Sequence, residues 1–96
     1  MNTTFPMIVK FTVKKEHLDF VKEKLIELVN ITKKEDGCIL YELHQDKESS
    51  HVFVFYEVWQ TQEHWAKHDQ SPHVQKFLKV TDDCFERVEV NKLTKI

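Results

Sequence analysis

The sequence predicts an α+β domain of the ferredoxin-like type, with the element order β-α-β-β-α-β and helices on one face of an antiparallel sheet. Two observations predict this fold. Runs rich in β-branched and aromatic residues alternate along the chain with segments whose apolar residues recur at helical spacing, and the connecting segments are short and polar. The 96 residues are enough for one domain, which we place at 1–96.

The chain opens with a predicted strand followed by a predicted helix. Residues 7–14 (MIVKFTVK) are apolar and β-branched with partial alternation, which is typical of a strand. Residues 17–33 carry leucine and valine at helical spacing with charged residues between them, which predicts an amphipathic helix. Gly37, the only glycine of the chain, is suited to the left-handed conformation that often follows a helix.

The second half of the chain continues with a hairpin, a broken helix and a last strand. Residues 38–46 and 52–59 predict two strands joined by a short polar connection. Thr61 is a suitable N-cap for the helix that follows. Ser71-Pro72 predicts a second helical start, because serine caps well and proline fits the first helical position. Residues 84–93 (CFERVEVNKL) alternate and predict the last strand.

The strand at 52–59 is apolar on both faces, which bears on assembly. Alternation places Phe53, Phe55, Glu57 and Trp59 on one face and Val52, Val54, Tyr56 and Val58 on the other. Helices in this architecture cover only one face, so the other face needs a partner. We expect a homodimer in which two such sheets pack face to face as a dimeric α/β barrel.

Composition argues against several functional classes. The formal net charge is −2 and no basic stripe is present, so we do not expect nucleic-acid binding. No apolar run has membrane-spanning length and the first residues lack the pattern of a secretory signal, so we expect a cytoplasmic protein without membrane contact. Cys38 and Cys84 have no CxxC spacing, which favours free thiols in a reducing compartment. A single glycine cannot build a phosphate-cradling loop or a dinucleotide fingerprint.

The segment 58–73 (VWQTQEHWAKHDQSPH) holds both tryptophans and three of the six histidines, which makes it the candidate site. A metal site is one interpretation, because imidazoles of His64, His68 and His73 are suitable zinc ligands. The metalloprotease pattern HExxH is absent, however, and Ser71-Pro72 interrupts the helix between the last two histidines. We therefore expect no metal ion and an exposed His64.

The wall of a small-molecule pocket is the interpretation that we favour, since most such sites combine apolar walls with a few convergent polar groups. The aromatic candidates are Phe53, Phe55, Trp59, Trp65 and Phe77, and the polar candidates are Tyr41, His44, Glu57, His68 and His73. A histidine titrates near neutral pH and can transfer a proton. The alternatives are that each aromatic ring belongs to the ordinary core and that His68 only hydrogen-bonds the backbone at a helix end.

Several motifs together resemble those of the antibiotic biosynthesis monooxygenase family. They are EDGC at 35–38 with YEL at 41–43, FYEVW at 55–59 and HDQSPH at 68–73, and the resemblance covers essentially the whole chain. The family consists of small dimeric α/β-barrel proteins and includes quinol monooxygenases. The resemblance implies oxygenation without flavin, metal or other cofactor. Removal of a phenolic proton gives an electron-rich anion that can itself pass an electron to dioxygen.

The resemblance also implies roles for individual residues. His68 would act as the base, with His44 or His73 as the alternatives. Trp59 matches a tryptophan of the polyketide-oxidising branch, and Trp65 falls where that branch carries a tyrosine that lines the site.

Some positions depart from the family patterns. Phe55 stands where the polyketide-oxidising branch has an asparagine, so the polar group that handles oxygen there is missing. The asparagine and the haem-ligating histidine of the haem-degrading branch have no counterparts, so we do not expect haem degradation. Arg87 is the only arginine, which argues mildly against a phosphorylated substrate.

The sequence thus predicts a cofactor-independent monooxygenase that oxidises a quinol or a related small aromatic with dioxygen. We expect His68 and Trp59 to be catalytic. The residues expected to contact the substrate are Tyr41, His44, Phe55, Trp65 and His73. The alternatives are a non-catalytic small-molecule-binding or stress-response dimer, an isomerase of the same fold, and a metal-dependent enzyme that uses His64, His68 and His73.

Overall fold

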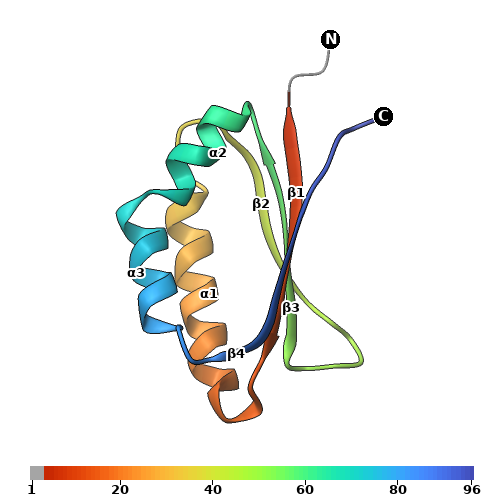
Figure 1. Cartoon of the computed structure of the whole chain (residues 1–96), viewed down its shortest axis with the longest axis vertical. Coiled ribbons are helices and arrows are strands. Elements are labelled where there is room, and N and C mark those ends of the chain that lie inside the picture. Colours follow the sequence, from red (N-terminus) through yellow and green to blue (C-terminus); the bar gives the residue numbers. More distant parts are fainter. Residues whose placement is uncertain (1–3) are drawn as a thin grey trace.

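The structure is a computed structural model that describes residues 4–96. Residues 1–3 lie outside the described part, although the predicted domain and the N-terminal segment considered as a signal both include them. The elements, shown in Figure 1, are β1 (Phe5–Val13), a short 3-10 turn η1 (Lys15–His17), α1 (Leu18–Thr32), β2 (Cys38–Gln45), β3 (Val52–Trp59), α2 (Gln62–Asp69), α3 (Pro72–Val80) and β4 (Phe85–Lys92). The predicted β-α-β-β-α-β order is confirmed, with the second helix divided into α2 and α3. Within the described residues, no helix combines the length and the apolar character needed to cross a membrane.

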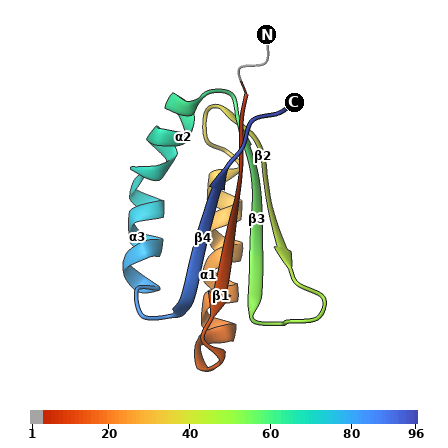
Figure 2. The same ribbon diagram turned by 45° about the vertical axis from the view of Figure 1, so that its right-hand side comes forward.

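The four strands form one sheet in the order β2-β3-β1-β4, and every neighbouring pair is antiparallel. All three helices lie on the same face of this sheet, as the two views in Figures 1 and 2 show. The ferredoxin-like α+β class is therefore confirmed. The sheet of one chain stays open, with β2 and β4 at its edges, so a closed barrel is not formed within a single chain.

The hydrophobic core lies between the sheet and the helices. The β3 residues on the helix-facing side are all buried, and they are Phe53, Phe55, Glu57 and Trp59. They meet Met7, Val9 and Phe11 of β1 on one side and Tyr41 of β2 on the other, and α1 and α3 cover them with Val21, Leu25, Leu28, Val74 and Phe77. Glu57 is the one charged residue type among these buried strand residues.

The ends of the helices follow the predicted capping chemistry. Thr61 Oγ1 accepts a hydrogen bond from the backbone nitrogen of His64 at 3.2 Å, and this begins α2. Ser71 Oγ accepts from the backbone nitrogen of Val74 at 3.4 Å, and proline follows at the start of α3. Gly37 has φ of 81°, which confirms the left-handed residue between α1 and β2.

The opposite face of the sheet has no helix over it. Tyr56 is 37% exposed and Ile39 is 53% exposed on this side. Ile8 of β1 lies directly opposite Tyr56, so apolar side chains of neighbouring strands adjoin one another there. The sequence-based expectation of an uncovered apolar face is therefore met within one chain.

Candidate functional site

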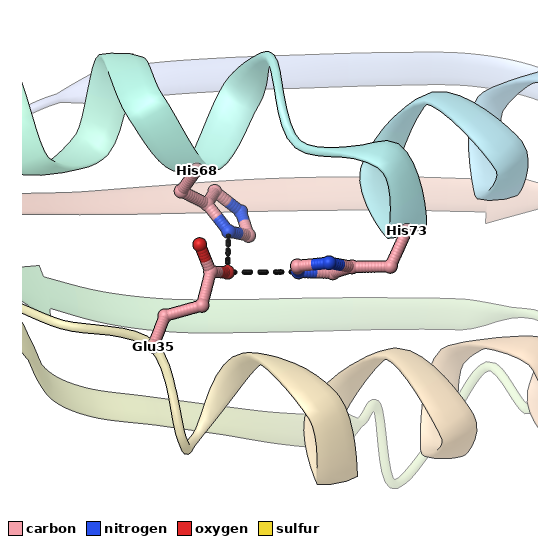
Figure 3. A group of neighbouring side chains, drawn as sticks. All are labelled: Glu35, His68 and His73. Carbon is pink, nitrogen blue, oxygen red and sulfur yellow. Dashed lines mark hydrogen bonds and ion pairs between the residues drawn. The ribbon is translucent and has the colours of Figure 1, made fainter.

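A group of three polar side chains forms at the end of the sheet where α2 gives way to α3 (Figure 3). Glu35 comes from the loop after α1, His68 from the last turn of α2 and His73 from the first turn of α3. One carboxylate oxygen, Oε2 of Glu35, lies 2.5 Å from His68 Nδ1 and 2.9 Å from His73 Nε2. The side chain of His68 is only 6% exposed, so this group is largely shielded from solvent.

The break between α2 and α3 positions the two histidines. Ser71 Oγ donates a hydrogen bond to the backbone carbonyl of His68 at 2.6 Å and also caps α3. One hydroxyl therefore ends the first helix and begins the next, while Pro72 occupies the first position of α3. This connection directs His68 and His73 toward the same loop although they leave different helices.

The loop that carries Glu35 is a tight turn. The backbone nitrogen of Glu35 donates to the carbonyl of Thr32 at 3.0 Å, and the nitrogen of Cys38 donates to the carbonyl of Glu35 at 3.2 Å. The left-handed Gly37 completes the turn, and the ring of His64 lies in the space that a side chain on this glycine would occupy. The turn therefore fixes the backbone of Glu35, from which the carboxylate reaches both histidines.

The hydrogen bond from Glu35 determines which nitrogen of His68 carries a proton. An ionised carboxylate only accepts hydrogen bonds, so Nδ1 donates and Nε2 of a neutral ring holds the free lone pair. Burial lowers the pKa of His68 below its usual value, although the hydrogen bond and charge of Glu35 act in the opposite direction. A neutral imidazole that is oriented by a carboxylate is the arrangement of a general base.

Aromatic rings surround His68 on its inner side. The ring of Trp59 lies 4.6 Å from it, centroid to centroid, and the ring of Tyr41 lies 5.5 Å away. Phe55 packs against Tyr41 at 4.6 Å. These three residues, predicted to be near His68, are brought together with it and are fully buried.

The buried glutamate of β3 is bonded to one of these rings. Trp59 Nε1 donates to Glu57 Oε1 at 2.9 Å. Burial raises the pKa of Glu57 to about 7, and the negative charges of Asp69 and Glu35 contribute in the same direction. Burial, with the charge of Glu57, also raises the pKa of Tyr41 well above its usual value. Glu57 is therefore a second group that can exchange a proton near neutral pH.

Two predicted contact residues lie away from this group. His44 is opposite Val54 in the register, so it projects from the uncovered face, where it is exposed and lies 3.3 Å from Glu42. Trp65, one turn before His68 on α2, packs against the ends of β1 and β4, with its ring 5.6 Å from that of Phe5 and 4.5 Å from Lys92 Nζ. The structure thus turns His44 to the other face of the sheet and seats Trp65 against the outer strands, away from the contacts of His68.

The third histidine considered as a metal ligand is also separate. His64 Nδ1 is 2.7 Å from Thr61 Oγ1, and its Nε2 is 3.6 Å from a carboxylate oxygen of Asp36. The third member of the group with His68 and His73 is Glu35 and not His64. The sequence indicated Glu35 only as part of a turn motif. The signal that could have identified it is topological, since the α1–β2 turn and the α2–α3 break lie at the same end of the domain.

A groove reaches this group from outside. It runs between α1 and α3, has a volume of about 360 Å³, and includes His73 among its lining residues. Leu28, Ile31, Phe77 and Val80 make much of its surface apolar, and its charged lining residues are Lys76 and the ion pair of Lys24 with Glu27 at 3.1 Å. Trp59 and Phe55 do not line this groove; they lie in the packed layer behind the histidines.

Comparison with known proteins identifies the family to which this chain belongs. A family model described as antibiotic biosynthesis monooxygenase matches residues 4–80. The chain belongs to the antibiotic biosynthesis monooxygenase family. The resemblance found in the sequence motifs is thereby confirmed.

Solved structures of several proteins share this fold over nearly the whole chain. PA3566 from Pseudomonas aeruginosa is 27% identical, with a TM-score of 0.94, over 100% of this chain and 97% of that chain. A conserved protein from Methanosarcina mazei is 24% identical, with a TM-score of 0.92, over 99% of this chain and 95% of that one. A candidate antibiotic biosynthesis monooxygenase from Nitrosomonas europaea is 20% identical, with a TM-score of 0.93, over 100% and 93%.

One curated relative, the uncharacterized protein sll1783 of Synechocystis, is 29% identical over 79 residues, which make up 78% of this chain. The chain spans about half of that relative, since the match covers 54% of its length. Family membership therefore establishes the fold, while the activity and the substrate have to be argued from this chain's own residues.

Proposed function

We propose that this protein is a monooxygenase that oxidises a quinol or a related phenolic aromatic with dioxygen, without a cofactor, and that His68 is its base. The observation that carries the proposal is the pair of Glu35 and His68. The carboxylate orients a buried imidazole so that Nε2, the nitrogen that does not bond it, has a lone pair for a phenolic proton. Membership of the monooxygenase family supports the reaction class.

The reaction balances without an external reductant. A hydroquinone and dioxygen give a hydroxyquinone and water, so one oxygen atom enters the substrate and the other leaves as water. The quinol supplies all four electrons. The protein has to remove a phenolic proton, because the resulting anion donates its first electron to dioxygen far more readily than the neutral phenol. His68 performs this step, and its lowered pKa keeps the ring neutral and ready to accept a proton at neutral pH.

The aromatic residues beside His68 have a supporting role. Trp59, predicted to be catalytic, uses its indole N–H to hold Glu57 and presents its ring to His68. Its contribution is therefore to position a proton-exchanging carboxyl group and to exclude water from the imidazole. The groove between α1 and α3 supplies a route for a flat apolar molecule to reach this group through the side of His73.

We further propose that two chains associate through the uncovered face of the sheet. Ile39 and Tyr56 are exposed on it, and Val54 and Val58 are only half-buried there. A second copy of the same face would bury this surface with two-fold symmetry. We place the protein in the cytoplasm, because both Cys38 and Cys84 are free thiols.

Oxygen uptake tests the proposed reaction. Metal-stripped protein is mixed with a panel of hydroquinones and naphthols, and the product is analysed by mass spectrometry after reaction with isotopically labelled dioxygen. We expect uptake above the autoxidation rate and one labelled oxygen atom in the product. His68→Ala should reduce turnover by a factor of about 10² to 10⁴, the usual contribution of a general base.

His64→Ala is the matched control, because His64 lies one turn earlier on α2 and bonds Thr61 instead of Glu35. Equal turnover by His68→Ala and the unmodified protein would remove His68 from the mechanism. Absence of uptake across the panel would favour the binding protein or the isomerase, and ligand identification would follow.

A further inference from the structure

The side chains of Glu35, His68 and His73 together offer three ligand atoms to a metal ion. Glu35 offers a carboxylate oxygen, and His68 and His73 each offer a ring nitrogen, with all three ligand atoms within 4.8 Å of one another. Figure 3 shows the two imidazoles approaching the same carboxylate oxygen from different directions. Because both nitrogens converge on the carboxylate oxygen, the three donor atoms lie close enough together to share one cation.

We infer that Glu35, His68 and His73 form a binding site for a divalent first-row transition-metal ion such as Zn²⁺. A set of two imidazoles and one carboxylate binds such transition-metal ions in preference to Mg²⁺ or Ca²⁺, because the latter two ions take oxygen ligands. The set leaves a further coordination position for water or another small ligand, as in sites with three protein ligands.

Binding requires only a local rearrangement. Ligand atoms around a tetrahedral Zn²⁺ lie about 3.3 Å apart, given metal–ligand bonds of roughly 2.0 to 2.2 Å. The carboxylate oxygen of Glu35 is 2.5 Å and 2.9 Å from the two nitrogens, so it has to turn away slightly as the ion enters. The imidazole of His68 meanwhile shifts its proton from Nδ1 to Nε2, which leaves Nδ1 able to bind the ion.

Burial and rigidity favour a true site over a chance surface cluster. His68 is 6% exposed, and Glu35 and His73 are 19% and 20% exposed at their side chains. The Ser71 hydroxyl fixes the carbonyl of His68 and caps the helix that carries His73, so both ligands stand on anchored backbone. His73 also lines the groove between α1 and α3, so the group is in contact with the surface there.

A metal ion bound at this site would also prevent His68 from acting as a base. A cation that takes Nδ1 of His68 and the carboxylate of Glu35 removes the hydrogen bond that orients His68, so it competes with the arrangement needed for proton removal. If the proposed monooxygenase reaction is correct, Zn²⁺ inhibits it. The binding inference itself stands independently of that reaction.

Metal binding is measured on the full-length protein without any substrate. Chelator-treated protein is dialysed against Zn²⁺, and bound metal is determined by elemental analysis; Co²⁺ is added in parallel as a spectroscopic probe. We expect about one Zn²⁺ per chain and visible Co²⁺ absorption of the intensity given by a four- or five-coordinate ion. Glu35→Gln and His73→Ala should each weaken binding at least about tenfold.

His64→Ala is the control, because it removes an imidazole from the same helix that also stands beside a carboxylate but points elsewhere. Its affinity should match that of the unmodified protein. An unmodified chain that retains no Zn²⁺, or gives only the spectrum of hydrated Co²⁺, overturns the inference even if the variants fail to fold. Equal loss in His64→Ala and His73→Ala also overturns it. Failure of the oxygenase assay leaves these results unaffected.

Discussion

The indole nitrogen of Trp59 donates a hydrogen bond to the carboxyl group of Glu57 at 2.9 Å, inside a layer that is otherwise apolar. Glu57 is 3% exposed, and burial raises its pKa to about 7 from the 4.5 of an exposed glutamate. The indole bond alone therefore does not offset the cost of removing this carboxylate from water, and the group keeps its proton until near neutral pH.

Stability should consequently fall as pH rises through this range. Between pH 4.5 and about 7 the folded chain holds a proton on Glu57 that the unfolded chain has released. The folded state then binds more protons, so the free energy of unfolding decreases with pH, by up to about 3 kcal/mol in total. Glu57→Gln should remove this slope and be more stable than the unmodified protein above neutral pH.

Urea unfolding of both proteins at about pH 5 and about pH 8, at one protein concentration, measures this difference. The titration of His68 changes the free energy of unfolding equally in both proteins, so its effect cancels in the comparison. A stability difference that does not change between the two pH values would contradict the raised pKa of Glu57.

Glu35→Gln should lower the turnover number on the best quinol while changing its KM little. The glutamine amide lacks the negative charge that stabilises the imidazolium formed when His68 accepts a proton, and its nitrogen can stabilise the wrong ring tautomer. We expect a loss of about tenfold to a thousandfold, smaller than that of His68→Ala. Steady-state kinetics of the two variants beside His64→Ala measure this order, and a Glu35→Gln enzyme as active as the control would show that the carboxylate does not act through His68.

Val58→Lys should prevent association of two chains. Val58 lies on the uncovered face with Pro6 of β1 and Leu40 of β2 beside it, so an ammonium group there would be buried between the two sheets. Light scattering after size exclusion should give a dimer for the unmodified protein and a monomer or unfolded chain for the variant. Ile26→Lys places the same charge on the outer side of α1, where the residue is already 46% exposed, and should remain dimeric. A monomeric unmodified protein would refute the proposed interface.

Gly37→Ala should destabilise the domain. A non-glycine residue at φ of 81° costs roughly 1–2 kcal/mol, and the added methyl group also collides with the ring of His64. We expect a total loss of at least about 2 kcal/mol in the free energy of unfolding. The double variant Gly37→Ala/His64→Ala should recover the part that is due to the collision. Chemical denaturation of the three proteins separates the two causes, and a neutral Gly37→Ala would contradict both.

The sequence predicts most of this fold because its signals are local. Strand alternation in β3, the caps at Thr61 and Ser71, and the left-handed Gly37 all depend on a few neighbouring residues. The grouping of Tyr41 with the other aromatic residues under the helices follows from the same alternation once the hairpin is placed.

The site was harder to predict because it depends on long-range placement. Glu35 and His73 are 38 positions apart, and only the antiparallel topology brings their loops to one end of the domain. His44, in contrast, could have been excluded from the sequence alone. It lies three positions after Tyr41, and alternation places residues three apart on opposite faces of a strand, so His44 projects from the uncovered face when Tyr41 projects under the helices.

The thiol of Cys38, beside the candidate site, is unreactive because it stays protonated at neutral pH. Cys38 lies opposite Trp59 in the sheet, and burial together with the charges of Glu35 and Glu57 raises its pKa to about 11. At neutral pH roughly one molecule in 10⁴ carries the thiolate, which is the form that peroxides and alkylating reagents attack. A side reaction that releases partly reduced oxygen would therefore leave this cysteine intact, and iodoacetamide should label it only slowly while the chain is folded.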